Sequence, residues 1–409
     1  MTHGQPGLRV FVVGLGVVTP AGSGCDATLA ALRDGSRHLS PLTLFDAPRG
    51  QAPVGQVQDL SGPEDLPRTH RLARMAAAEA MSGATEPPGA VVLGGTTGGM
   101  PQTEELLRAG IRDPQRYRYH ATGSVADDIA GVYGCTGPAV TVSTACSSGA
   151  VALKIALEML RAGRAQTVLA GGVDGLCRLT YHGFGMLQLL DPEGARPLDV
   201  SRGGMSVGEG AGLMLLQAST ETPAGAMAEL LGGGLSCDAY HPSAPHPEGV
   251  GALAAIRAAL EDAGLNPEQV DYINLHGTGT RDNDACEAKA IRALFPAIAP
   301  PLSSTKGTFG HSLAAAGAVE AAIGVFALRH GILPANVGCT VPDPALGLDP
   351  IREPRAGAPQ VVLSNSLGFG GNNAALLLGA PDRTAVVRDR GRVGPVALRV
   401  LSAACITGA

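Results

Sequence analysis

The alternation of short β-rich runs with longer helical patterns constrains the fold of this chain more than any other feature. In the first half, the β-rich run 138–142 precedes the stretch 149–162, whose apolar residues recur at helical spacing. In the second half, a helix expected over 250–263 stops at Gly264 and is followed by a strand over 270–275. This alternation predicts an α/β fold with parallel sheets and with its chemistry at the carboxyl ends of the strands. Further strands are expected over 9–13, 90–93, 167–170, 213–216 and 361–363, and a further helix over 314–330.

A glycine-rich stretch, 14–20, follows the first expected strand, and we expect it to form a turn. It begins like a dinucleotide-binding fingerprint, but Thr19 occupies the position of the third glycine, which argues against a Rossmann domain. The junction between two half-domains is expected within 218–234. We therefore expect an N-terminal half over 8–217, a C-terminal half over 226–380, and a tail over 381–409 that lies outside the core.

Composition excludes several classes of protein. No apolar run approaches the roughly 20 residues of a membrane span, and the first residues lack the pattern of a signal peptide, so we expect a cytoplasmic protein without a membrane span. The formal net charge of −6 disfavours nucleic acid as a partner. The eight cysteines form no C-x-x-C pair, which disfavours zinc sites and a disulfide framework, so no metal is expected.

Cys146 is the candidate nucleophile. It lies in VSTACSSGA, 142–150, between the β-rich run and the helical pattern, which places its thiol on a strand-to-helix turn. The unpaired N–H groups at a helix N-terminus are expected to favour the thiolate. A buried structural cysteine is the alternative reading of this residue taken alone.

Two distant histidine motifs favour the catalytic reading. LHGTGT, 275–280, follows an expected strand, so His276 is expected to project from the strand end, with Asp284 and Glu287 downstream. SSTKGTFGH, 303–311, supplies His311, together with Lys306 and, nine residues after the histidine, Glu320. The loop NSLGFGGNN, 365–373, surrounds Phe369 with glycines, which suits backbone N–H donors and a movable aromatic gate.

With these motifs in this order, the chain resembles the elongating β-ketoacyl-acyl-carrier-protein synthases, the decarboxylating ketosynthases of the thiolase-like superfamily. The resemblance covers about residues 8 to 380 and includes DVSRGGMSVGEGAG, 199–212. It implies a thiolase-like fold, in which two βαβαβαββ halves form a five-layer αβαβα sandwich. It also implies a decarboxylative Claisen condensation of malonyl-ACP with a cysteine-bound acyl chain, in polyketide, aryl-polyene or fatty-acid biosynthesis.

The resemblance also implies a role for each motif residue. Cys146 accepts the acyl chain, and the backbone N–H groups of Cys146 and Phe369 form the oxyanion hole. His276 and His311 bind the malonyl thioester carbonyl and stabilise the enolate that remains when CO2 leaves. The remaining expected roles are the fixing of His311 by Lys306 and Glu320 and the binding of the pantetheine arm by Thr278, Thr280 and Asn372, where Asn372 replaces the family's usual Thr.

The implied partners are acyl carrier protein, whose phosphopantetheine carries the substrates without a further cofactor, and a second subunit. That subunit is either a second copy of the chain or a chain-length-factor-like homologue. The chain itself could instead be such a partner with weak or no condensing activity, but chain-length factors lack the cysteine. Two other enzyme classes of this fold are also disfavoured by the residues present. A thiolase usually has two catalytic cysteines and one histidine, and an initiating synthase has Asn at the position of His311.

Two further segments, one rich in arginine and one containing two histidines, can be interpreted without a catalytic or metal-binding role. Arg68, Arg71 and Arg74 are expected on a solvated helix face, or alternatively in a patch that docks the acidic carrier protein, with Arg116 and Arg118 as weaker candidates. His241 and His246 lie in a proline-rich segment without further ligands at metal-binding spacing, and we interpret them as structural.

Overall fold

The computed structural model describes residues 8–47 and 52–383, so the tail predicted over 381–409 lies almost entirely outside the described residues. The first half of the chain contains β1 (Arg9–Thr19), β2 (Gly22–Ser23), α1 (Cys25–Asp34), α2 (Arg68–Ala80), β3 (Val91–Gly94), α3 (Met100–Arg108), η1 (Pro114–Tyr117), α4 (Ser124–Val132), β4 (Ala139–Val142), α5 (Ser148–Arg161), β5 (Thr167–Asp174), α6 (Arg178–Met186) and β6 (Gly210–Ser219). The second half contains β7 (Ala228–Cys237), α7 (Val250–Ala263), η2 (Pro267–Gln269), β8 (Tyr272–Asn274), α8 (Arg281–Leu294), β9 (Leu302–Ser303), α9 (Lys306–Phe309), η3 (Leu313–Ala315), α10 (Ala316–His330), β10 (Ile332–Leu333), β11 (Arg355–Ala356), β12 (Val361–Gly368), η4 (Phe369–Gly371) and β13 (Asn372–Gly379).

The two halves repeat one strand order. The strands of the first half lie in the order β1-β6-β5-β3-β4, and those of the second in the corresponding order β7-β13-β12-β8-β9. In each half, the strand that comes last in the sequence, β6 or β13, is antiparallel to both of its neighbours in this order. The remaining neighbours pair in parallel. The expectation of parallel sheets was therefore wrong for β6 and β13. Strand β13 follows β12 after a short connection, which allows only an antiparallel pair, whereas β6 follows β5 after α6 and a long loop and still returns antiparallel.

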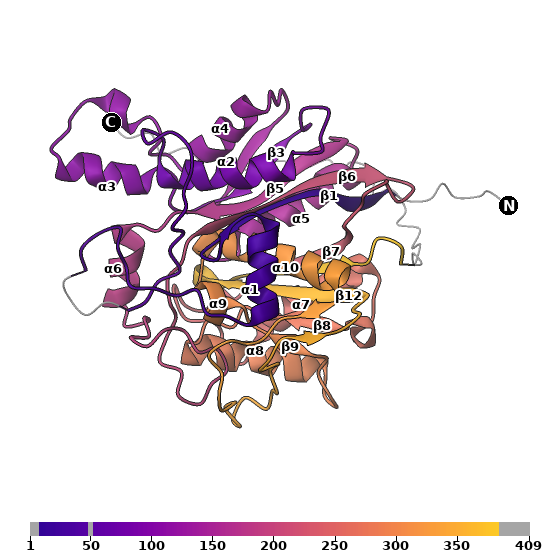
Figure 1. Ribbon diagram of the computed structural model, residues 1–409. Helices are drawn as coiled ribbons and strands as arrows, with labels where there is room; N and C mark the ends of the chain where they lie inside the picture. The colour runs from indigo at the N-terminus through magenta and orange to yellow at the C-terminus, as the bar shows by residue number, and fades with distance from the viewer. Residues whose placement is uncertain (1–7, 48–51, 384–409) are drawn as a thin grey trace, which may run out of the picture.

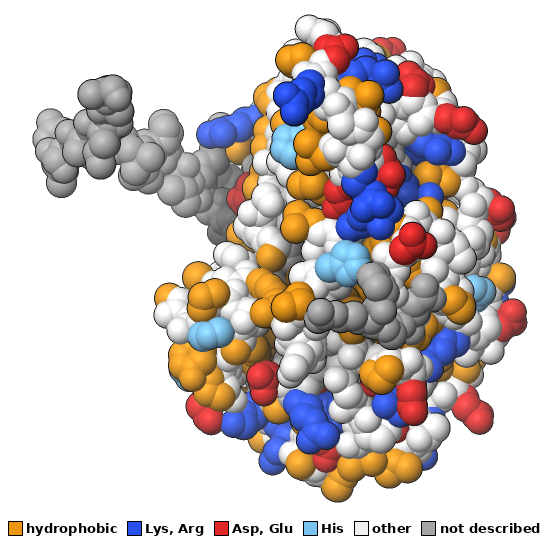
Figure 2. All heavy atoms as spheres, turned by 90° about the vertical axis from the view of Figure 1, so that its left-hand side faces the viewer, with side chains coloured by type: hydrophobic (Ala, Val, Ile, Leu, Met, Phe, Trp, Pro, Cys, Tyr) orange, Lys and Arg blue, Asp and Glu red, His pale blue; other side chains and the backbone are white. Residues whose placement is uncertain are grey.

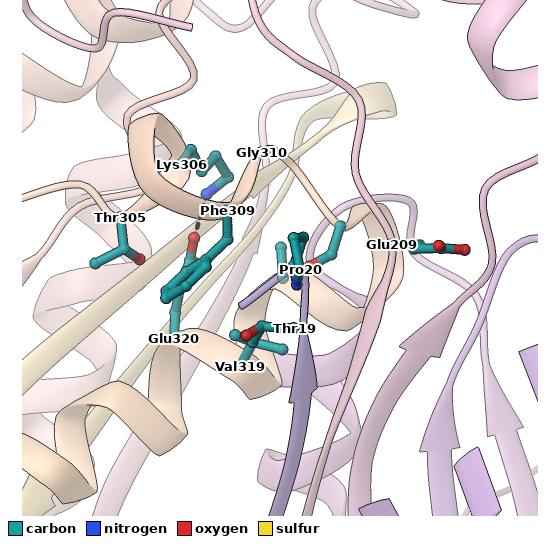
Figure 3. Close-up of a pocket in the computed structure, with 11 residues that line it drawn as sticks. Thr19, Pro20, Glu209, Thr305, Lys306, Phe309, Gly310, Val319 and Glu320 are labelled. Atoms are coloured by element: carbon teal, nitrogen blue, oxygen red, sulfur yellow. Dashed lines mark hydrogen bonds and ion pairs between the residues drawn. The ribbon is translucent and has the colours of Figure 1, made fainter. Parts of the chain in front are cut away.

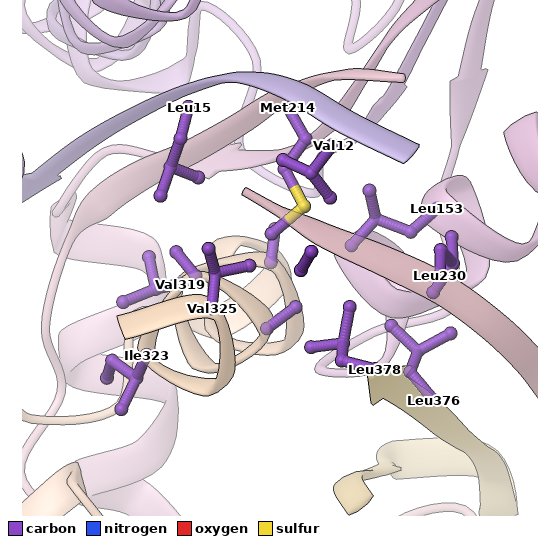
Figure 4. Packing of buried hydrophobic residues seen from close by; sticks show 14 of the residues in the cluster. Val12, Leu15, Leu153, Met214, Leu230, Val319, Ile323, Val325, Leu376 and Leu378 are labelled. Carbon is purple, nitrogen blue, oxygen red and sulfur yellow. The ribbon is translucent and has the colours of Figure 1, made fainter. Parts of the chain in front are cut away.

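Five layers stack across the molecule, and the implied αβαβα sandwich is confirmed (Figure 1). Strand residues alternate between the layers: Val91 and Leu93 of β3 pack with α2 and α4, whereas Val92 packs in the central layer with α5. In β13, Leu376 and Leu378 face the central layer, and Leu377 packs with α7 and α8. Figure 4 shows the central cluster, where residues of α5 and α10 meet side chains from strands of both halves.

Two glycines of β1 allow a helix to approach closely. A Cβ atom on Gly14 would lie 2.0 Å from the carbonyl oxygen of Ala80, and one on Gly16 would lie 1.9 Å from that of Ala76. The turn predicted over 14–20 was therefore wrong: β1 continues to Thr19, and its glycines make room for α2. The predicted junction was also too wide, since β6 extends to Ser219 and β7 begins at Ala228.

The helical stretch Leu313–His330 has the length and the mean hydropathy, 1.3, of a membrane span, yet 83% of it is buried inside the protein. It packs between the two sheets as a core helix. Its N-terminal end lies beside the candidate site.

Candidate active site

Cys146 lies on a tight elbow between β4 and α5. Ala145 adopts a left-handed φ of 54°, which a non-glycine residue rarely does. Hydroxyl groups hold this turn: Ser148 Oγ donates to the carbonyl oxygen of Ala145 at 2.6 Å and accepts from the N–H of Thr144 at 2.9 Å. The predicted strand-to-helix position of the thiol is therefore confirmed.

Burial controls the ionisation of this thiol. Cys146 is 7% exposed, and its desolvation raises the pKa to about 11, although Lys306 and the backbone N–H of Phe369 act in the opposite direction. The backbone N–H groups act in the expected direction, toward the thiolate, but burial outweighs them and the net shift of the pKa is upward. At neutral pH Cys146 is a thiol, so its proton must leave when it attacks a thioester.

His276 and His311 face the same cavity as Cys146, with ring centroids 5.1 Å apart and ring planes at 85°. Burial, reinforced by the charge of Lys306, holds both pKa values well below the ordinary value, so both imidazoles are neutral. Both ring nitrogens of His311 are buried without a hydrogen-bond partner in the described part of the protein. His311 can therefore accept a proton or donate one toward a ligand in the cavity.

Lys306 and Glu320 form a buried ion pair (Figure 3). Nζ of Lys306 lies 3.2 Å from Nδ1 of His276 and donates to the carbonyl oxygen of the same residue at 2.5 Å. The pair was expected to fix His311, but in the described residues its hydrogen bonds run to His276. Burial raises the pKa of Glu320 to about 7, against the opposing charge of Lys306.

A second, much smaller cavity of about 10 Å³ is lined in part by this ion pair. Thr19, Phe309 and Val319 contribute to its wall, as Figure 3 shows. Its volume matches that of one water molecule, and Oε2 of Glu320 has no protein partner in the described chain. The cavity is too small for a substrate, so the chemistry belongs to the larger cavity.

The larger cavity, of about 380 Å³, brings most of the predicted site together. Thr278 and Thr280 line it, with their hydroxyl oxygens 2.8 Å apart. Phe369 also lines it and packs against Phe184 with ring centroids 5.6 Å apart, a contact that the sequence did not predict. Among the described residues, no group of three or more His, Cys, Asp or Glu side chains is placed to hold a metal ion.

Asn372 does not line this cavity, contrary to its predicted place beside the pantetheine arm. Its side-chain amide instead donates to the carbonyl oxygen of Phe369 at 3.0 Å, which braces the gate loop. The next residue, Asn373, lines the cavity and donates to Asp238 at 2.8 Å. The predicted cavity residue was therefore wrong by one position. Successive side chains of β13 point to opposite faces of the sheet, and the side chain of Asn373, not that of Asn372, faces the cavity.

Two buried carboxylates position the site through backbone contacts that the sequence did not reveal. Glu287 accepts the N–H groups of His276 and Gly277, each at 2.8 Å, and so holds the histidine loop rather than a ring. Asp174, at the end of β5, accepts the N–H of Thr97 at 2.8 Å and that of Ala314 at 2.9 Å. Asp174 therefore links the two halves beside the site. The position of Asp174 at the end of an expected strand was the sequence signal that could have marked it as a site residue.

The arginines of α2 are half-buried and engaged by neighbouring groups, so they do not form the freely solvated face that was expected. Arg68 pairs with the fully buried Glu209, Arg71 donates to the carbonyl oxygens of Leu60 and Ser61, and Arg74 pairs with Asp128. The side chain of Arg74 is 36% exposed, whereas that of Arg68 is 16% exposed. On the face that carries α3 and α6, basic side chains lie in separate groups with acidic side chains among them (Figure 2).

His241 and His246 lie in a surface loop, as predicted. Nδ1 of His241 accepts the N–H of Ala244 at 3.0 Å, and Nδ1 of His246 accepts that of Glu248 at 3.2 Å. Residues 243–245 of this loop also border the large cavity, which the sequence did not indicate.

Comparisons with known proteins match this geometry. Residues 8–222 match the family model of the β-ketoacyl synthase N-terminal domain, and residues 227–340 that of the C-terminal domain. The chain is 33% identical to 3-oxoacyl-[acyl-carrier-protein] synthase 2 of Synechocystis sp. over 90% of this chain and 97% of that protein. It is 34% identical to a putative polyketide β-ketoacyl synthase 1 of Streptomyces cyaneus over 91% of this chain and 98% of that protein.

Solved structures give the same result. The ishigamide ketosynthase/chain length factor superposes with a TM-score of 0.86 at 35% identity, covering 91% of this chain and 99% of that one. A type II polyketide synthase ketosynthase in complex with its acyl-carrier protein superposes with a TM-score of 0.84 at 28% identity, covering 92% of this chain and 100% of that one. A ketosynthase in complex with its chain length factor, from Xenorhabdus doucetiae, has a TM-score of 0.80 at 32% identity, covering 91% and 98%.

Proposed function

The chain belongs to the β-ketoacyl synthase family, and on this basis we propose that it catalyses the decarboxylative Claisen condensation of malonyl-ACP with an acyl chain held on Cys146. It is an acyltransferase of polyketide or fatty-acid biosynthesis with the thiolase-like fold. The observation that carries the proposed roles is the single cavity that Cys146 shares with two neutral, buried histidines.

The first half-reaction transfers the acyl chain to Cys146. The sulfur attacks the acyl thioester, the thiol proton passes to a neutral imidazole, and the pantetheine thiol leaves with a proton. His311 is suited to accept the proton because both of its ring nitrogens lack partners in the described chain. The backbone N–H groups of Cys146 and Phe369 both lower the pKa of the thiol, and we propose that they donate to the oxyanion that forms when the sulfur attacks.

The second half-reaction uses malonyl-ACP. The bond to the carboxylate carbon breaks, CO2 leaves, and the electron pair moves into the thioester enolate. Because Lys306 has only donors, Nδ1 of His276 accepts from it, and the ring proton must lie on Nε2. His276 and His311 therefore offer N–H donors to the enolate oxygen. The α-carbon then attacks the acyl carbonyl, the C–S bond breaks, and the Cys146 thiolate takes up one proton from solvent to restore the thiol.

Acyl carrier protein supplies both substrates on phosphopantetheine, and the proposed reaction needs no further cofactor. Thr278 and Thr280 are proposed to bind the pantetheine arm, since their hydroxyl groups line the cavity on the way to Cys146. Phe369 gates this path, braced by Phe184 and by the amide of Asn372. Of the two α2 arginines that form ion pairs, Arg74 is the more accessible docking candidate, because Arg68 pairs with a buried carboxylate. The weaker candidates Arg116 and Arg118 are both exposed.

We propose that the enzyme acts as a dimer. Strand β4 ends the sheet, and its residues are partly exposed along an edge that has no partner in the described chain. Helix α6 exposes two large apolar side chains, Leu179 at 61% and Met186 at 76%. Its C-cap residue, Leu187, is 52% exposed and also lines the cavity. A second subunit, either a copy of the chain or a chain-length-factor-like homologue, would cover both features and complete the wall of the cavity.

Product analysis tests this function. Purified protein given acyl-ACP and malonyl-ACP should release one CO2 for each β-ketoacyl-ACP formed. If activity requires coexpression with a chain-length-factor-like homologue encoded nearby, the heterodimer is supported; full activity of the chain alone in a sedimenting dimer supports the homodimer. A fully active monomer contradicts both. The alternative role, a partner subunit without its own chemistry, is disfavoured by the complete set of Cys146, His276 and His311.

A further inference from the structure

One short segment lines the large cavity from its interior to its mouth. His276 is 2% exposed and Thr278 is 6% exposed, whereas Thr280 is half-buried and Arg281 is exposed. All four residues border the cavity that contains Cys146. The segment therefore marks a path from the catalytic groups to the surface.

Arg281 is the only lysine or arginine on the described lining of this cavity. Other arginines near the same loops are held by internal carboxylates: Arg196 pairs with Asp191 at 3.0 Å, and Arg202 pairs with Asp343 at 2.7 Å. Within the described residues, the Arg281 side chain makes no hydrogen bond or close ion pair, although its charge contributes to the lowered pKa of Asp343, which Arg202 already engages. Its guanidinium group is therefore available to a ligand at the mouth.

Arg281 is also the first residue of α8, a helix of 14 residues. The first amides of a helix have no partner within the helix, and this end of the helix favours negative charge. The N-cap residue, Thr280, makes no side-chain cap hydrogen bond. Of the two acidic residues of the first turn, Asp284 accepts inward N–H groups from Leu198 and Gly279, and Asp282 is exposed at the mouth. Asp282 weakens the anion preference there, so the guanidinium group carries the inference.

We propose that Arg281 binds the phosphate of the phosphopantetheine arm, an inference that rests on the function proposed above. A linear arm whose sulfur reaches Cys146 and whose amides pass Thr278 and Thr280 places its other end at the mouth. That end is a phosphodiester, and a guanidinium group binds phosphate oxygens through paired N–H donors. The malonyl carboxylate is at the opposite, histidine end of the arm, so the two anionic groups have separate sites.

The test compares malonyl thioesters of pantetheine and of 4′-phosphopantetheine, which differ only in the phosphate. CO2 release is measured with the wild-type protein, Arg281→Ala, Arg281→Lys and the matched control Arg257→Ala, which alters an exposed arginine of α7. We expect Arg281→Ala to raise KM for the phosphorylated thioester by about tenfold, the scale of one hydrogen bond to a charged group. KM for the pantetheine thioester and both kcat values should stay within about twofold, and Arg281→Lys should be intermediate.

Three results would overturn the proposal. Equal changes of KM for both thioesters would assign Arg281 to the shape of the loop, and an unchanged KM for both would leave it without a role in binding. A change seen only with thioesters on intact carrier protein would assign it to protein docking.

A binding measurement separates this proposal from the proposed function. Calorimetry with Cys146→Ala protein compares pantetheine with 4′-phosphopantetheine without any chemistry. The tighter binding of the phosphorylated form should be lost in Cys146→Ala/Arg281→Ala. If no thioester releases CO2 with the wild-type protein, the proposed function fails, while the calorimetric comparison still decides the phosphate site.

Discussion

The ammonium group of Lys306 lies 3.2 Å from Nδ1 of His276 and simultaneously pairs with Glu320. Because an ammonium group can only donate, this contact makes Nδ1 the acceptor and leaves the proton of the neutral ring on Nε2. Lys306 thus acts through His276: it fixes the tautomer in which the imidazole is a donor. His311 has no such contact in the described chain, so its ring is free to exchange the two roles.

This difference predicts separable effects of the two histidines. His276→Ala should lower CO2 release from malonyl-ACP by roughly 100-fold or more, the loss expected on removing an oxyanion donor, while acylation of Cys146 continues. His311→Ala should lower decarboxylation to a similar extent and also slow acylation, because it removes the proposed proton acceptor. The check is CO2 release measured beside acyl-enzyme mass. Equal losses of both half-reactions in both variants would contradict the assignment.

The buried ion pair predicts a pH-dependent loss of stability in Lys306→Ala. Burial already raises the pKa of Glu320 to about 7, and removal of the opposing charge should raise it further. In the variant, the carboxyl group stays neutral at pH 6, but at higher pH it must either ionise while buried or keep a proton that the unfolded chain has released. The loss should therefore be small at pH 6 and grow toward about 3 kcal/mol above pH 8. Urea unfolding at both pH values measures it, with Lys306→Met/Glu320→Gln as control; a loss that is independent of pH would count against this account.

The raised pKa of Cys146 predicts slow alkylation at neutral pH. With a pKa of about 11, about one thiol in a thousand is ionised at pH 8. The rate of modification by iodoacetamide, followed by peptide mass mapping of Cys146, should therefore rise about tenfold per pH unit between pH 7 and 10. A rate that levels off below pH 8 would show instead that the helix end dominates. Lys306→Ala should be slower still, because Lys306 lowers the thiol pKa.

Gly16 tests the packing of the fold. A methyl group there would lie 1.9 Å from a backbone oxygen of α2, so Gly16→Ala should lower the free energy of unfolding by about 3 kcal/mol or prevent folding. Gly183→Ala is the matched control, because the same change in α6 meets no atom within 4 Å. Urea midpoints of the two variants provide the comparison. A Gly16→Ala protein within about 0.5 kcal/mol of the wild type would be incompatible with this close approach.

Local signals predicted much of the fold. Helix α7 spans Val250–Ala263 as expected, since its apolar spacing is regular and Gly264 ends it with a left-handed φ of 70°. The stretch from Gly14 to Thr19 was misread because glycine permits both a turn and a close approach. Only the position of α2, far along the chain, decides between the two.

In the site, too, local sequence signals predicted some features, whereas others depend on contacts between distant segments. Cys146, His276 and His311, which line one cavity, could be singled out as candidates because each lies in a motif at a strand or helix end. The thiol pKa was predicted in the wrong direction because burial depends on both halves of the chain. The roles of Asp174 and Glu287 are contacts to distant backbone amides, and Arg68 is paired with Glu209 from a separate segment. No spacing along the sequence reports such contacts.

The attachment of the acyl chain to Cys146 is the central claim, and intact-protein mass spectrometry tests it most directly. After incubation with acyl-ACP, the wild-type protein should gain the mass of one acyl group, and peptide mapping should place it on Cys146. Cys146→Ala removes one sulfur atom, so its stability should change by no more than about 1 to 2 kcal/mol, and a matching unfolding midpoint shows that the protein is folded. We predict no adduct on this folded variant; the same acyl adduct on Cys146→Ala, or an adduct mapped to another residue of the wild type, would contradict the account.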